Sequence, residues 1–84
     1  MKKGKLLEKL LRGSKNVRFD ELVTVVEAFG FRLSRVNGSH HIFIHHQVTE
    51  LVNLQNDKGK AKPYQVRQFL TLVEQYNLQL EEDP

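Results

Sequence analysis

The apolar residues of this chain change their spacing near residue 30, and that change limits the folds open to it. Apolar side chains recur at helical spacing over residues 19–29, and Gly30 follows, where helices often end in a left-handed residue. Over residues 31–36, apolar and polar residues approximately alternate, as they do in a half-buried strand. The sequence therefore predicts a helix that leads directly into a β-strand.

Three strands are predicted in succession. The Asn-Gly pair at 37–38 is a strong hairpin signal, and it separates a strand over residues 31–36 from a second strand over residues 41–46. Residues 47–49 are expected to turn, and residues 50–56 to form the third strand. Short links between successive strands favour an antiparallel meander.

Two further helices complete the predicted fold. Pro63 suits the first turn of a helix, and apolar residues then recur at helical spacing up to Tyr76. Residues 1–12 are basic with a leucine stripe and predict a short extra helix. The expected fold class is α+β, in the order α-β-β-β-α after the extra helix, with a three-stranded antiparallel sheet and helices on one of its faces.

The 84 residues are expected to form one domain. Its parts are a basic helix and turn over residues 1–16, a core over residues 19–78, and an acidic tail over residues 79–84 that is expected to fray. The chain has no cysteine, which excludes disulfides and thiolate metal sites. It has neither an apolar run of about 20 residues nor a secretory signal pattern, so a cytoplasmic protein is expected.

The charge balance is more basic than the net value suggests. The formal net charge is +3, but three of the ten acidic residues lie in the last four positions, which leaves 13 basic residues against 7 acidic ones elsewhere. Such a surplus is typical either of a solvated surface that aids solubility or of a protein that binds a polyanion.

Four histidines lie within seven residues, at 40, 41, 45 and 46. On a strand, His41 and His45 would share a face at a separation of about 13 Å. One ion with ligand bonds of about 2.1 Å cannot join them, so no metal site is expected and His45 and His46 are interpreted as exposed. Ser39 next to His40 is not a nucleophile arrangement, because neighbouring strand residues face opposite ways.

The alternation leaves the orientation of the second strand open. If Phe43 points into the core, His41 and His45 lean inward with it at the edge of the sheet, and His40 then points to the face without helices, together with Ile42 and Ile44. The opposite orientation buries the two isoleucines and exposes Phe43. The run is apolar on both sides, so the pattern does not decide between them.

A lysine-rich loop precedes the last helix. Lys58, Lys60 and Lys62 lie just before the helix start, where positive charge opposes the helix dipole. A bound anion would reverse that effect, and a nucleic-acid phosphate is the natural candidate. Arg67 would extend this basic patch, and Tyr64 would either stack on a base or cap the core. A solvated loop without a ligand is the alternative.

These residues resemble a known family. The run Gly-Ser-His-His-Ile-Phe at residues 38–43, a third strand, and the Lys-Gly-Lys run at 58–60 that leads through Pro63 into an amphipathic helix are similar to the HicA family. HicA proteins are small toxins of bacterial toxin–antitoxin pairs, and the resemblance extends over residues 19–78. It implies a compact fold like that of double-stranded RNA-binding domains, which agrees with the order of elements above.

The resemblance implies an endoribonuclease that cleaves messenger RNA without a metal or other cofactor and is inhibited by a HicB-family antitoxin. The histidine directly after Gly-Ser, His40, would act as general base on a ribose 2′-hydroxyl. RNA contacts would come from the sheet face and the lysine loop. The candidate RNA-binding residues are Ser39, His41, Lys58, Lys60, Lys62 and Arg67. The general acid stays open between His41, Lys60 and water.

Residues 1–18 extend beyond the shortest family members, and their basic helix would cap the core, widen the RNA surface or meet a partner. Ile42 and Ile44 are the expected apolar patch for an antitoxin if Phe43 points inward. A different class of function, an RNA-binding module without chemistry, would use the same basic loop and sheet face.

Overall fold

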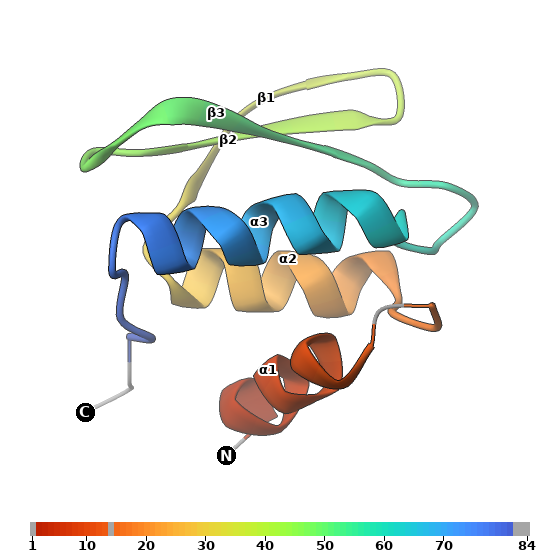
Figure 1. Ribbon diagram of the computed structural model, residues 1–84. Helices are drawn as coiled ribbons and strands as arrows, with labels where there is room; N and C mark the ends of the chain where they lie inside the picture. The colour runs from red at the N-terminus through yellow and green to blue at the C-terminus, as the bar shows by residue number, and fades with distance from the viewer. Residues whose placement is uncertain (1, 14, 82–84) are drawn as a thin grey trace.

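The structure is a computed structural model that describes residues 2–13 and 15–81, and its elements form three layers (Figure 1). A three-stranded antiparallel sheet in the order β1-β2-β3 forms the first layer. Helices α2 and α3 cover one face of the sheet, and α1 forms the third layer beyond them. The elements are α1 (Lys2–Arg12), α2 (Phe19–Ala28), β1 (Arg32–Asn37), β2 (His40–His45), β3 (Val48–Gln55) and α3 (Pro63–Gln75). The predicted fold class is confirmed.

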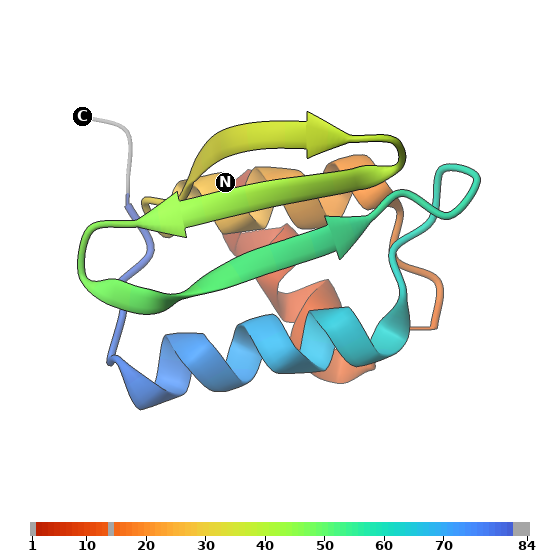
Figure 2. The same cartoon turned by 90° about the horizontal axis from the view of Figure 1, so that it is seen from above.

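The helix boundaries follow the signals in the sequence. The C-cap of α2 is Phe29, and Gly30 then adopts a φ of +95°, the left-handed conformation that ends many helices. Pro63 is the first residue of α3, where its missing N–H costs no hydrogen bond. Seen from above, α2 and α3 run beneath opposite edges of the sheet (Figure 2).

The first hairpin uses a two-residue loop, Gly38-Ser39, and Asn37 belongs to β1, so the predicted bounds of the first two strands, 31–36 and 41–46, are each one residue off. Asn37 pairs with His40 across it, and Gly38 has a φ of +62°. A positive φ at the first of two loop residues is the requirement of a type II′ turn. The hairpin glycine therefore places His40 at the first position of β2.

The predicted turn at residues 47–49 and the predicted start of the third strand at residue 50 are wrong. The loop between β2 and β3 is His46-Gln47, and β3 begins at Val48. Val48 is buried and pairs with His45, but the register shifts between this pair and the pair of Phe43 with Val52. This irregularity interrupts the alternation of buried and exposed residues at the start of β3, and that alternation is the signal by which a strand is predicted from sequence.

Phe43 points into the core and is 1% exposed, which settles the orientation that alternation left open. It belongs to the same core cluster as Phe29, Phe31 and Phe69, and in that cluster the Phe69 ring of α3 makes edge contacts with the other two rings. Leu10 of α1 also belongs to the core. The remaining core residues are Val17, Phe19, Leu22, Val25, Val26, Val48, Val52, Leu54, Ala61, Val66 and Leu78.

His45 is buried, in contrast to the exposed position predicted for it. Its Nε2 lies 3.1 Å from the Phe29 carbonyl oxygen, and its Nδ1 accepts the backbone N–H of Gln47 at 3.0 Å. The carbonyl accepts and the amide donates, so the two contacts match the tautomer of His45 that has a proton on Nε2 and a lone pair on Nδ1. Its ring also contacts Phe31. His46 is exposed as predicted and stacks on His45.

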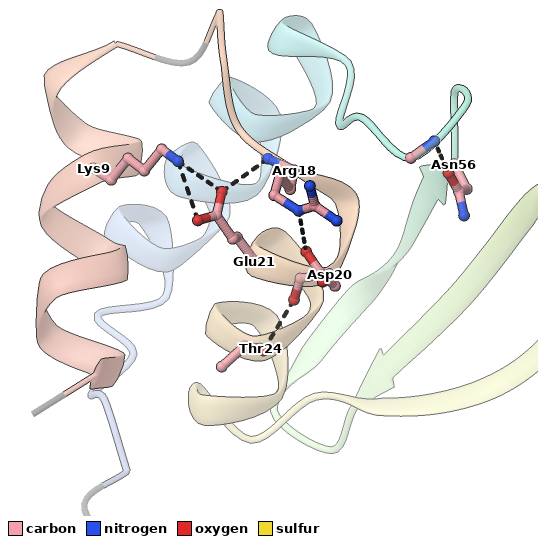
Figure 3. A network of polar contacts seen from close by, with 7 residues as sticks. Lys9, Arg18, Asp20, Glu21, Thr24 and Asn56 are labelled. Carbon is pink, nitrogen blue, oxygen red and sulfur yellow. Dashed lines mark hydrogen bonds and ion pairs between the residues drawn. The ribbon is translucent and has the colours of Figure 1, made fainter.

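An ion pair joins α1 to α2 (Figure 3). Lys9 Nζ lies 2.8 Å from Glu21 Oε1, and the same carboxylate accepts the backbone N–H of Arg18 at 2.9 Å. The hydrogen bond from Lys9, followed by that from Arg18, holds the pKa of Glu21 below its ordinary value. The extra helix is thus tied to the first turn of α2.

The end of the described chain returns to α2. The Glu81 N–H donates to the Ala28 carbonyl at 2.6 Å, and Leu78 is buried. Residues 82–84 of the acidic tail, and residue 14 of the predicted turn, lie outside the described residues. Within the described part of the chain, no helix has both the length and the apolarity to cross a membrane.

Candidate active site

His40 lies on the open face of the sheet, the face that α2 and α3 leave uncovered. Phe43 points to the helices, and alternation therefore directs His40 and Ile42 the other way. Asn53 pairs with Ile42 across β2 and β3 and shares that face. His40 is half-buried, and its Nδ1 lies 3.0 Å from Asn53 Oδ1. The open face thus presents an imidazole held by a neighbouring strand.

His41 and Ser39 are placed differently. The His41 ring packs against Phe19 on the helix side, with centroids 4.8 Å apart, and its Nδ1 lies 3.3 Å from the Ser39 carbonyl oxygen. That carbonyl also accepts the backbone N–H of Asn56 at 2.8 Å. Ser39 itself is exposed in the turn. The structure therefore does not bring the imidazoles of His40 and His41 together.

The lysine loop is a tight hairpin, which we call the basic hairpin (residues 57–60). Asp57 and Lys60 exchange two backbone hydrogen bonds of 3.0 Å. Lys58 and Gly59 between them have φ values of 54° and 88°, as a type I′ turn requires. The Asn56 side chain accepts the Gly59 N–H at 2.7 Å (Figure 3). The backbone that carries Lys58 and Lys60 is thus fixed by three hydrogen bonds within residues 56–60.

The basic hairpin and His40 lie at the same end of the sheet. His40 pairs with Gln55, the last residue of β3, and the hairpin begins two residues further along the chain. Two backbone hydrogen bonds hold the hairpin and the residue that follows it to the start of α2 and the segment before it, from Phe19 N–H to the Gly59 carbonyl at 2.9 Å and from Ala61 N–H to the Val17 carbonyl at 3.0 Å. The backbone therefore holds the basic hairpin at the end of the sheet where His40 lies.

Lys62 and Arg67 extend the positive charge along α3. Lys62 is the N-cap residue of α3, and its Nζ lies 3.9 Å from Asp57 Oδ2. Arg67 is exposed and lines a groove of about 500 Å³ between β3 and α3. Asn53 and Tyr64 line the same groove. The groove therefore includes Asn53, the residue whose side chain contacts the His40 ring. No acidic residue lies in the first turn of α3.

The structure does not gather the four histidines into an arrangement that could bind one metal ion. In residues 2–13 and 15–81, no three His, Cys, Asp or Glu side chains are arranged to hold an ion. His41 and His45 do share the helix side, but each contacts a different aromatic ring, Phe19 or Phe31.

The expected apolar patch of Ile42 and Ile44 is largely absent. Ile42 is 7% exposed although it lies on the open face, and Ile44 is half-buried. Ile42 belongs to the central strand, where Arg35 and Asn53 flank it as direct cross-strand partners. The large apolar side chains that the sheet does expose belong to its edge strands. They are Leu33, Val36 and Leu51.

The sequence interpretation missed two polar residues at this end of the sheet. Asn53 alternates with the buried Val52 and Leu54, so its face follows from the pattern once Phe43 is known to point inward. Gln65 is buried, and its Oε1 accepts the backbone N–H of Gln55 at 2.8 Å. That bond ties the end of β3 to α3. No local pattern marks Gln65, because its role depends on a strand ten residues away.

The fold and the site define a small α+β protein that presents one histidine and a basic hairpin at the same end of an open sheet face. The sequence model of a family described as the HicA toxin of bacterial toxin–antitoxin pairs matches residues 19–75. The chain belongs to the HicA toxin family, which supports a toxin role and implies a cognate antitoxin, HicB. The searches of curated proteins and of solved structures return no match.

Proposed function

We propose that this protein is a toxin that cleaves messenger RNA, with His40 as the general base. The observation that carries the proposal is the position of His40 on the open face, at the sheet end from which the basic hairpin extends. An imidazole titrates near neutral pH and can take a proton there. A polyanionic substrate bound along the lysines would pass beside it.

In this reaction, His40 removes the proton of a ribose 2′-hydroxyl. The resulting oxygen attacks the adjacent phosphorus, the bond to the 5′-oxygen breaks, and that oxygen takes a proton from a general acid. The products are a 2′,3′-cyclic phosphate and a 5′-hydroxyl. A positioned general base contributes about 10²–10⁴-fold to such a step. Lys60 or water fits the acid role better than His41, whose ring lies on the helix side.

Phosphate contacts supply the affinity in this proposal. Lys58 and Lys60 are exposed on the basic hairpin, Lys62 follows at the start of α3, and Arg67 faces the groove. The exposed Ser39 lies in the turn beside them. Each lysine or arginine that neutralises a phosphate releases counterions, so binding weakens steeply with salt. A HicB-family antitoxin would inhibit the enzyme, and the cytoplasm, where messenger RNA is translated, would be its place of action.

The test is RNA cleavage by purified His40→Ala in the presence of a chelator, with His46→Ala as the matched control. His46 is an exposed imidazole at the other end of β2. Wild type and His46→Ala are expected to cleave, and His40→Ala to lose at least about 100-fold in rate while it keeps the wild-type circular dichroism spectrum. Cleavage by a folded His40→Ala at the control rate would refute the role of His40. Tight RNA binding by a wild type that leaves the RNA intact would instead identify a non-catalytic RNA-binding module.

A further inference from the structure

The direction of the hydrogen bond between His40 and Asn53 follows from which atom of the Asn53 amide faces the ring. The atom 3.0 Å from His40 Nδ1 is the amide oxygen of Asn53, which accepts hydrogen bonds and donates none. The bond therefore forms only if Nδ1 carries a proton. In a neutral imidazole with Nδ1–H, the lone pair is on Nε2.

We propose that Asn53 is a positioning residue that holds His40 in the Nδ1–H tautomer and so leaves Nε2 as the basic atom. The proposal rests on the proposed function of His40 and adds to it the atom that takes the proton. A base oriented by a third polar group is a recurrent arrangement in enzymes that activate a hydroxyl or thiol, and an asparagine serves in some of them.

The backbone around Asn53 fixes where its amide stands. Val52 and Leu54 on either side are 5% and 1% exposed, so β3 is anchored in the core on both sides of Asn53. Asn53 pairs with Ile42 in the ladder, and His40 is paired two residues further along with Gln55. His40 and Asn53 are therefore diagonal neighbours on one face of the sheet, and at that spacing the two side chains can touch.

A neutral acceptor suits a base that must change its charge. The amide oxygen accepts the Nδ1–H both before and after Nε2 is protonated, so the ring keeps its orientation through the proton transfer. A carboxylate in the same place would hold the ring too, but it would favour the charged imidazolium before any substrate is bound.

The direct test is the tautomer of His40, read from the nitrogen chemical shifts of its ring in protein labelled with ¹⁵N on histidine. At a pH where the ring is neutral, wild type is expected to show protonated Nδ1 and free Nε2. Asn53→Ala is expected to lose this signature, and Asn53→Asp, which keeps an acceptor, to retain it. Protonated Nε2 in the wild type, or the same tautomer in Asn53→Ala, would overturn the proposal.

The second readout is cleavage of a defined RNA under single-turnover conditions. Asn53→Ala is expected to cleave about 10- to 100-fold more slowly than wild type, which is less than the loss of the whole base. Gln75→Ala removes an exposed amide at the far end of α3 and is the matched control. Amide exchange of β3 and circular dichroism report whether the variant sheet is intact. A folded Asn53→Ala that cleaves at the wild-type rate would also overturn the proposal.

The two proposals fail in distinguishable ways. If His40→Ala still cleaves RNA, the function of His40 is wrong, whatever the tautomer is. If His40→Ala is inactive while Asn53→Ala keeps both tautomer and rate, His40 is the base and Asn53 does not position it.

Discussion

Lys9 of α1 and Glu21 of α2 form an ion pair at 2.8 Å, with the lysine side chain 42% and the glutamate side chain 22% exposed. This contact joins a helix outside the family match, which begins at residue 19, to the first turn of the matched part. Glu21 also accepts the backbone N–H of Arg18. The extra helix therefore belongs to the same packed unit as the rest of the fold.

Replacing Glu21 with glutamine is expected to make the protein less stable at neutral pH, by about 1 kcal/mol or less, as for other partly exposed ion pairs. The pKa of Glu21 is lowered in the folded state from its ordinary value of 4.5. A lowered folded pKa contributes stability above the unfolded pKa, and this contribution is lost as the pH falls through the folded pKa. The difference between wild type and variant should thus be present at pH 7 and shrink below about pH 4.5.

The measurement is urea unfolding from pH 7 down to the acid limb. Glu8→Gln is the control, because Glu8 lies 3.8 Å from Arg12 with both side chains largely exposed. A difference for Glu21→Gln that stays constant with pH would contradict the assignment.

Leu10 and Leu11 form a matched pair that tests whether α1 is part of the core. Leu10 is 2% and Leu11 is 64% exposed. Leu10→Ala is expected to cost about 2–5 kcal/mol, since it leaves a cavity, whereas Leu11→Ala should change the free energy of unfolding by about 0.5 kcal/mol or less. Thermal or chemical unfolding measures both. Equal effects would mean that α1 does not pack as described.

Gly38 and Gly30 differ in what a side chain would meet. At Gly38 the φ is +62° and an added Cβ meets nothing within 4 Å, so Gly38→Ala is expected to cost about 1 kcal/mol from backbone strain alone. At Gly30 the φ is +95°, and the Cβ would lie 2.8 Å from Glu81 Oε2, the end of an exposed side chain that can move, and 3.0 Å from His45 Nε2. That ring is buried and hydrogen-bonded to Phe29, so Gly30→Ala should cost more, above about 2 kcal/mol.

Unfolding midpoints of the two alanine variants make this comparison. The ranking depends on His45 being unable to move away without loss of its two hydrogen bonds. A Gly38→Ala protein that is the less stable of the two would show that the first hairpin is more constrained than its open surroundings indicate.

The basic hairpin predicts a change in the salt dependence of RNA binding. Lys58→Ala with Lys60→Ala should weaken binding to single-stranded RNA and reduce the slope of log K against log salt by about 1.4, at about 0.7 for each phosphate that is no longer neutralised. The assay is fluorescence anisotropy at several salt concentrations, in the His40→Ala background so that the RNA stays intact.

Lys5→Ala is the control for this prediction. Lys5 is exposed on α1, in the layer farthest from the open face (Figure 1). The control should keep the slope of the parent protein. An equal reduction in both proteins would assign the effect to net charge rather than to the basic hairpin.

The sequence by itself determined the order of elements, the hairpin between β1 and β2 to within one residue, the end of α2 before Gly30, the start of α3 at Pro63, and the choice of His40 as the residue to examine. These are local properties, because turn chemistry and hydrophobic period depend on residues close together in the chain. The start of β3 was missed because it is not a local property. The register irregularity near it depends on how β3 pairs with β2, and the sequence of β3 alone shows no regular pattern there.

Only the tertiary structure decided which face of β2 meets the helices, because the run from Ile42 to Ile44 is apolar on both sides. Packing around Phe43 made that choice. It left His40 on the open face, drew His41 onto Phe19 and buried His45 against the end of α2. It also brought Asn53 beside His40 from thirteen residues away. Contacts between strands depend on register and burial, and these are properties of the assembled sheet rather than of any one segment.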